Sequence, residues 1–149
     1  MLTRYRTLRR EGAREIVIKK SRFIGYGKPV TTEDEAIAFI ESIRKKHWDA
    51  THNCYAYVIG DRDEIQKSSD DGEPSGTAGR PILEVIKAQQ LKYTAIVVTR
   101  YFGGILLGAG GLIRAYTEGA VQAIEASEPI ERVLRREVSV EADYTWYGK

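Results

Sequence analysis

The sequence predicts an α+β domain with a mixed sheet and helices on one face. Two observations lead to this class. Short runs rich in β-branched residues alternate with runs that repeat apolar residues every three or four positions, and residues 95–99 form an almost wholly apolar segment. The resulting order is strand, strand, helix, strand, helix, strand, helix, strand. With 149 residues, 42% of them hydrophobic, the chain can bury a sizeable core.

The first half of the chain contains three predicted strands and one helix. Residues 15–18 and 22–27 are predicted to form an antiparallel pair joined by a short basic turn. A capping box at Thr32 to Glu35 predicts a helix over residues 32–47. Residues 51–59 alternate like a strand. That alternation places Cys54, Ala56 and Val58 on one face, and Tyr55, Tyr57 and Ile59 on the other.

The second half begins with a long polar loop over residues 62–77, followed by a helix over 82–90 that Ser75 or Thr77 could cap. The apolar strand 95–99 has no polar alternate residue, which predicts a strand that is covered on both faces or central in its sheet. A last helix over 110–125 is expected to bury four residues at helical spacing. These are Ile113, Tyr116, Ala120 and Ile124.

The composition changes at Glu128. Pro129 ends the helix, and Val138, Val140, Ala142 and Tyr144 then alternate with polar residues. We therefore expect a domain boundary here, with residues 1–127 in one domain and residues 128–149 forming the first part of a second domain that is mostly absent.

Charge and cysteine content narrow the function classes. The formal net charge is only +2, although basic residues crowd the first thirty positions, so the overall charge does not by itself indicate nucleic-acid binding. The single cysteine, Cys54, excludes an internal disulfide and a cysteine-rich zinc site. Apolar runs are too short to span a membrane, and the N-terminus lacks the apolar core of a secretory signal. We expect a cytoplasmic protein that does not bind membranes.

Two glycine-rich turns, each leading into a helix and each accompanied by arginine, are the best candidate for a functional surface. Backbone amides at a helix start attract anions, and arginine adds paired donors beside them. We expect Arg80, Arg100 and Arg114 to surround one anion pocket. The alternative for Arg100 and Arg114 is a surface or interdomain ion pair.

Other chemistry is weaker. The second turn has Ala109 and Gly110 where a phosphate-binding loop needs Lys followed by Ser or Thr, so it is not such a loop. The carboxylates of Asp70, Asp71 and Glu73 could hold magnesium or act as acid and base, but loops of this kind are more often solvated or paired with arginine. His52 suits a structural hydrogen bond. We predict no catalytic residue, no metal and no cofactor.

Three segments together resemble the IMPACT/YigZ family over about residues 21–126. They are residues 52–57 (HNCYAY), 70–79 (DDGEPSGTAG) and 100–104 (RYFGG) leading to Gly110, Gly111 and Leu112. The resemblance implies a two-layer α/β sandwich like the fourth domain of elongation factor G, with a left-handed βαβ crossover. It also implies that residues 128–149 begin a ferredoxin-like C-terminal domain, truncated here.

The resemblance implies a non-catalytic module that contacts RNA, the ribosome or a translation-associated protein and takes part in translation regulation. The expected surface comprises Asp70, Glu73, Ser75, Thr77, Arg80, Arg100, Gly103, Gly104, Gly110 and Arg114. Two alternatives stay open. One is an enzyme acting on a phosphorylated or nucleotide-like small molecule, and the other is a protein-only regulator whose acidic loop docks on a basic partner.

Overall fold

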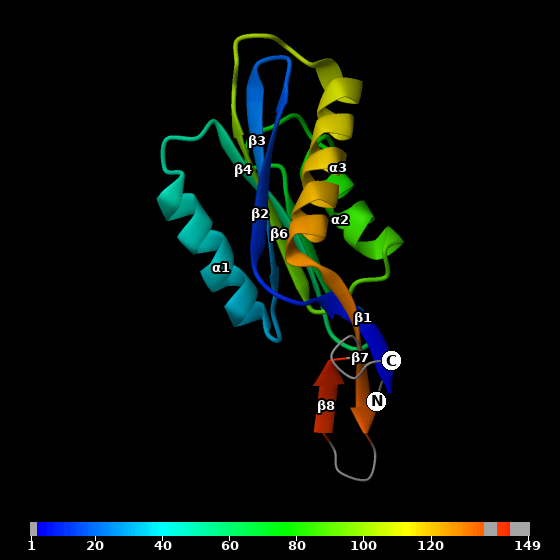
Figure 1. Ribbon diagram of the computed structural model, residues 1–149. Helices are drawn as coiled ribbons and strands as arrows, with labels where there is room; N and C mark the ends of the chain where they lie inside the picture. Colours follow the sequence, from blue (N-terminus) through cyan, green and yellow to red (C-terminus); the bar gives the residue numbers. More distant parts are fainter. Residues whose placement is uncertain (1–2, 136–139, 144–149) are drawn as a thin grey trace.

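A five-stranded antiparallel sheet forms the scaffold of the molecule (Figure 1). The structure, a computed structural model, describes residues 3–135 and 140–143. The strands pair in the order β2-β3-β6-β4-β5. Their bounds are Gly12–Ile18 for β2, Ser21–Pro29 for β3, His52–Ile59 for β4, Ile65–Ser69 for β5 and Thr94–Tyr101 for β6. The α+β class is confirmed, although all pairings in this sheet are antiparallel where a mixed sheet was expected.

The central strand β6 contributes to two cores, one on each face of the sheet. Ile96 and Val98 lie in the core on the first face, whereas Ala95 and Val97 lie in the core on the second. All four side chains are fully buried, which confirms the prediction, since the strand is both central and covered on both faces. The predicted alternation of β4 is also confirmed, because Cys54 belongs to the first core and Tyr57 to the second.

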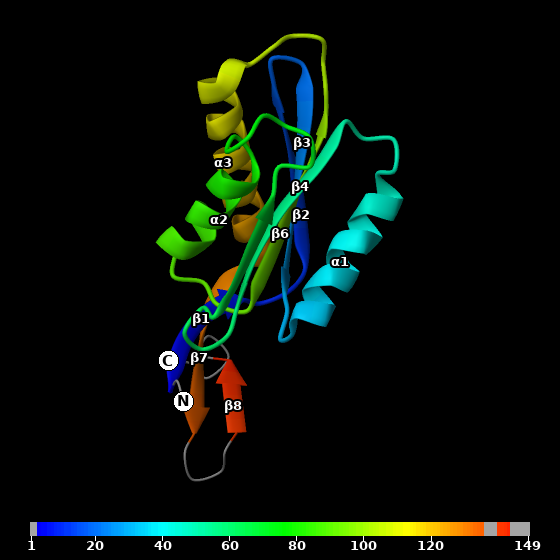
Figure 2. The same cartoon turned by 180° about the vertical axis from the view of Figure 1, so that it is seen from behind.

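Helices cover both faces of the sheet (Figures 1 and 2). Helices α2 (Gly79–Ala88) and α3 (Gly108–Ser127) pack on the first face and complete the expected two-layer sandwich. Helix α1 (Glu33–Lys46) packs on the second face and adds a further layer, where the sequence analysis placed helices on one face only. The physical reason is that Tyr26, Tyr57 and Val97 make the second face apolar, so it too requires cover.

A second, smaller sheet lies beyond one end of the first, with strand order β1-β7-β8 (Figure 2). Its strands are β1 (Arg4–Leu8), β7 (Pro129–Arg135) and β8 (Val140–Asp143). The alternation around Glu128 to Tyr144 is confirmed as strand at 140–143, while Val138 and Tyr144 lie outside the described residues. Strand β1 was not predicted, and it pairs with β7 although it was assigned to the first domain. The boundary at residue 128 and the ferredoxin-like identity stay predictions.

Some local details agree with the sequence predictions and others differ. Thr32 caps α1 by accepting a hydrogen bond from the Glu35 amide, as predicted. The prediction of a loop over residues 62–77 is wrong in part, because β5 occupies residues 65–69 and pairs with β4. Tyr116, Ala120 and Ile124 of α3 are buried as expected, but Ile113 is 42% exposed. Within the described residues, no helix is long and apolar enough to cross a membrane.

Candidate functional site

The three arginines expected to share one anion pocket lie apart. Arg80 is on α2 with its side chain 75% exposed, Arg114 is on α3 beside the β2–β3 turn, and each lines a different hollow. Arg100 points into the protein and is 5% exposed, because it continues the inward face of β6 that carries Ile96 and Val98. The prediction of a single pocket surrounded by all three arginines is therefore wrong.

The opening of α2 is already occupied by a carboxylate of the same chain. Asp70 accepts hydrogen bonds from the amides of Gly76, Ala78 and Gly79 at 2.9, 3.1 and 2.8 Å. Burial raises the pKa of Asp70, but the three backbone hydrogen bonds outweigh burial and hold the pKa below its ordinary value. Asp70 thus takes the place that an external anion was expected to fill at this helix start.

Neither Ser75 nor Thr77 caps α2 as predicted, since Ala78 is the capping residue and makes no side-chain cap. Thr77 is buried, and its hydroxyl donates to the carbonyl of Pro74 at 2.6 Å. Ser75 is exposed on the loop surface. The hydrogen bond from Thr77 to Pro74 joins two residues of the acidic loop, so Thr77 stabilises the loop itself.

Glu73 and Arg100 form a buried ion pair at the centre of a polar network. The Arg100 Nη1 donates to Glu73 Oε2 at 2.8 Å, and the two side chains are 6% and 3% exposed. The hydroxyl of Tyr116 donates to the same carboxylate oxygen. Burial, together with the neighbouring Cys54 and Glu73, raises the pKa of Tyr116 far above its usual value. Tyr116 is therefore a fixed hydrogen-bond donor to Glu73.

Two further residues complete the network. Ser21 Oγ, at the start of β3, accepts from Arg100 Nε and Nη2 at 3.4 and 3.2 Å and from the amide of Gly103 at 3.1 Å. His52 lies on the other side of Glu73, with its Nε2 3.4 Å from Glu73 Oε1. Its Nδ1 is 2.8 Å from the carbonyl of Asp71, and because a carbonyl can only accept, Nδ1 carries a proton. The predicted structural hydrogen bond of His52 is confirmed.

A pocket of about 440 Å³ opens above this network. We call it the Glu73 pocket. It is lined by Thr51, His52, Gly72, Glu73, Pro74, Arg100, Phe102, Leu106, Leu107, Gly108, Ala109 and Leu112. Its floor is polar and its upper wall is apolar. A larger hollow of about 580 Å³ lies toward the second sheet, between Tyr5 and Thr7 of β1 and Thr31 after β3, and it contains none of the residues predicted for the site.

The glycines of the second turn play different parts. A Cβ on Gly103 would lie 2.0 Å from the carbonyl oxygen of Lys20, so Gly103 allows the turn to pack on the β2–β3 hairpin. Gly104 has a φ of +91°, a left-handed conformation that favours glycine. Gly110 is open, since a Cβ there would meet only the Arg114 side chain at 3.5 Å. Helix α3 has no side-chain cap, so its first amides remain available.

An exposed basic surface lies beside α3, next to the turn between β2 and β3. Lys19 and Lys20 form the turn between β2 and β3, where both have positive φ values of 48° and 70°, and their side chains are exposed. Arg114 is also exposed, and it lines a hollow together with Lys19. Among residues 3–135, none of these three cations has an ion pair within 4 Å. We call Lys19, Lys20 and Arg114 the basic rim.

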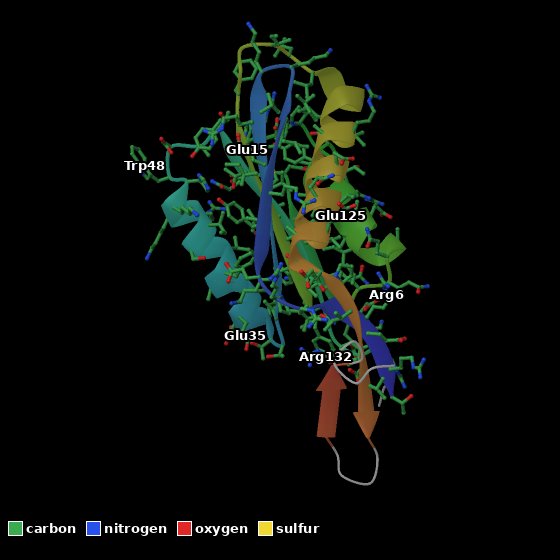
Figure 3. All side chains as sticks on the ribbon, in the orientation of Figure 1. Arg6, Glu15, Glu35, Trp48, Glu125 and Arg132 are labelled. Carbon is green, nitrogen blue, oxygen red and sulfur yellow. The ribbon has the colours of Figure 1, made fainter. Side chains whose placement is uncertain are left out.

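Large apolar side chains are exposed close to the basic rim. Phe102, Ile105 and Leu106 belong to the loop between β6 and α3, and they are 46%, 40% and 82% exposed. Trp48 is also 82% exposed, but it lies elsewhere, on the turn after α1, where it projects from the side of the molecule (Figure 3). Exposed apolar groups beside cations are typical of a binding surface rather than of a solvated loop.

Sequence reasoning missed several residues of this site. His52 was interpreted as structural only, and Tyr116 as core, whereas both contact Glu73. One available signal was the alternation of β4, which places His52 on the same face as Cys54. Cys54 itself is fully buried as expected, and burial raises the pKa of its thiol well above the usual range. No cluster of three or more potential metal ligands occurs in the described part of the chain.

The fold and this site define a compact α+β domain with a glycine-rich loop on either side of a buried Glu–Arg pair. Comparison with known proteins places it further. The family described as "Impact N-terminal domain" matches residues 19–124, and the chain therefore belongs to the IMPACT family. The match covers four of the five strands of the main sheet, β3, β4, β5 and β6, together with α1, α2 and most of α3, whereas β2 ends just before it begins.

Individual relatives agree with this assignment. The chain is 58% identical over 149 residues to "IMPACT family member YvyE" of Bacillus subtilis, covering 100% of this chain and 69% of that protein. It is 43% identical over 129 residues to "IMPACT family member YigZ" of Escherichia coli, covering 85% of this chain and 63% of the relative. A solved structure described as "Crystal structure of an hypothetical protein" aligns with a TM-score of 0.83 and 38% identity, covering 90% of this chain and 66% of that one.

Proposed function

We propose that the chain is a non-catalytic cytoplasmic module that binds RNA, free or within the ribosome, and takes part in translation regulation. The observation that carries the proposal is the basic rim. Three exposed cations without ion-pair partners in the described residues lie beside the uncapped start of α3. Cations of this kind release counterions when they contact phosphates, which favours binding.

The neighbouring apolar groups support RNA as the ligand. Phe102 is an exposed aromatic side chain near the basic rim, and single-stranded RNA offers unstacked bases that bind to such rings. The sites predicted from sequence divide accordingly. Arg114, Gly104 and Gly110 belong to the accessible surface, whereas Asp70, Glu73, Thr77, Arg100 and Gly103 support it from within. Ser75 and Arg80 are exposed on the α2 side, away from the basic rim.

The test is the salt dependence of RNA binding. If three cations contact phosphates of a single strand, log K should fall with log salt with a slope of about −2, or roughly 20-fold between 50 and 200 mM salt. Fluorescence anisotropy with a labelled single-stranded RNA measures this slope. The combined variant Lys19→Ala, Lys20→Ala and Arg114→Ala should bring the slope close to zero.

Arg80→Ala is the matched control, because Arg80 is equally exposed but lines a different hollow. It should leave both the affinity and the slope nearly unchanged. Absence of RNA binding at 50 mM salt would contradict the proposal, and so would an unchanged slope in the triple variant. In that event the other expected partner class, a translation-associated protein, becomes the subject of the next test.

A further inference from the structure

The Glu73 pocket has the size and wall chemistry of a small-ligand site. Its volume of about 440 Å³ lies within the range of roughly 300–1,000 Å³ that ligand pockets occupy. Leu106, Leu107 and Leu112 form one wall, and Pro74 forms part of another. Such sites combine mostly apolar walls with a few placed polar groups.

The floor of the Glu73 pocket presents a hydrogen-bond acceptor without net charge. Arg100 neutralises Glu73, and Arg100 and Tyr116 together occupy the Oε2 atom. The Oε1 atom faces only the His52 Nε2, at 3.4 Å, and so can accept from a ligand N–H. His52 itself is 18% exposed and is held in place by the Asp71 carbonyl. This floor suits a neutral group that carries N–H donors.

The side of the pocket presents an aromatic face. Phe102 lies against the guanidinium of Arg100, whose central carbon is 5.3 Å from the ring centroid. The ring is nevertheless 46% exposed, so part of its surface remains open to the pocket. Phe23 lies 5.4 Å from the same guanidinium carbon and helps to fix it. A planar heteroaromatic ring that rests on Phe102 would bring its polar edge toward the floor.

A cationic hollow adjoins the Glu73 pocket. Leu107 lines both, so the two are separated by one side chain. The second hollow is lined by Lys19 and Arg114 of the basic rim and contains one acidic residue, Glu118. A ligand that crosses Leu107 would therefore have an uncharged polar end in one hollow and an anionic group in the other.

We infer that the Glu73 pocket binds the base of a nucleotide whose phosphate lies on Lys19 and Arg114. Base and phosphate are the two chemically distinct parts that the adjoining hollows match. The nucleotide can be a free mononucleotide or one unit of an RNA strand, and only the second source rests on the proposed function.

Two pairs of probes separate the base from the phosphate. The first pair is a single-stranded trinucleotide and the same trinucleotide without its bases. The second is a set of four nucleoside monophosphates and ribose 5-phosphate. Base stacking and the contact to Glu73 should make each base-bearing probe bind about fivefold or more tightly than its base-free counterpart. Titrations followed by amide NMR shifts measure these affinities and show whether Gly72 and Gly108 at the pocket respond.

The variants Phe102→Ala and Leu106→Ala should each abolish most of this difference while leaving the base-free probes unchanged. Leu106 is 82% exposed, so its truncation does not test the fold. Trp48→Ala is the control, because Trp48 is an exposed aromatic side chain that does not line the pocket. It should retain the full preference for a base.

The outcomes distinguish the two proposals. Equal affinity for base-bearing and base-free probes overturns the nucleotide pocket and leaves salt-dependent RNA binding standing. Tighter binding of mononucleotides, with no binding of the trinucleotide or of RNA, supports the pocket and removes the proposed function. No binding of any probe overturns both, and a base preference that Phe102→Ala and Leu106→Ala leave intact overturns the pocket.

Discussion

Replacing Glu73 with glutamine should destabilise the protein strongly. Arg100 would keep its charge in a position where its side chain is only 6% exposed, and it would lose the carboxylate that accepts its Nη1–H at 2.8 Å. The new amide oxygen could still accept from the two donors, Arg100 and Tyr116, but the amide carries no charge to neutralise the guanidinium. A buried charge without a partner is costly, because water cannot reach the charge to take the place of the lost partner.

The expected loss is about 3–5 kcal/mol of the free energy of unfolding, the range found when one partner of a buried ion pair is removed. For a domain of this length each kcal/mol lowers Tm by roughly 2–4 °C, so Tm should fall by about 6–20 °C. Urea denaturation and calorimetry at pH 7 measure both quantities. Adding Arg100→Met to Glu73→Gln should recover part of the loss, because the orphaned charge is then gone.

The matched control is Glu15→Gln. Glu15 also accepts two hydrogen bonds from an arginine, Arg22, at 2.9 and 3.1 Å, but both side chains are largely in water. The control should leave Tm almost unchanged. The reasoning is refuted if Glu73→Gln lowers the stability no more than Glu15→Gln does, or if the double variant with Arg100→Met is less stable than Glu73→Gln alone.

Three other predictions concern the loops and the core. Asp70→Ala should lower the free energy of unfolding by about 1–2 kcal/mol at pH 7, because the amides at the start of α2 lose their acceptor. The pKa of Asp70 is lowered in the folded protein, so this difference holds above about pH 4 and closes as the pH falls through the folded pKa. Urea titrations at several pH values measure it. Gly103→Ala should lower the free energy of unfolding by about 1–3 kcal/mol, because the new Cβ would collide with the Lys20 backbone. Gly110→Ala should raise it by about 0.5 kcal/mol, because the Cβ there meets open space. Equal effects of the two variants on Tm would contradict the packing argument. Cys54 should react with a thiol reagent only after unfolding, and rapid labelling of the native protein would contradict its burial.

Periodicity predicted most of the fold, and it failed where strands are short and polar. Strand β5 has one apolar residue in five, Ile65, and lies at the sheet edge, so it shows no alternation to detect. Strand β1 is also short and has three polar residues among its five, Arg4, Arg6 and Thr7. The placement of α1 could have been inferred, because a central strand covered on both faces is incompatible with helices on one face only. The large side chains of Tyr55 and Tyr57 already indicated a second apolar face.

The sequence indicated Glu73 and Arg100 as candidate residues, but it did not indicate their contact with each other or with Tyr116. Glu73 and Arg100 are 27 positions apart, and their contact depends on how the acidic loop folds over the end of β6. Asp70 was expected to belong to the binding surface, yet it accepts hydrogen bonds from three amides, those of Gly76, Ala78 and Gly79. Local sequence therefore indicated candidate residues only. Which of them face solvent depends on contacts between distant segments.

The partnership of β1 with β7 affects how the chain can be made and cut. Arg4 lies opposite Val133, so β1 finds its neighbour β7 only after the intervening residues 9–128 have been synthesised. Closure of this very long loop should be a late event of folding. An expression fragment that starts at residue 128 would leave β7 with a bare edge, open to aggregation. A fragment that ends at residue 128 would leave β1 without β7, the strand with which it pairs. Excising either piece at the apparent boundary thus separates two segments that stabilise one another.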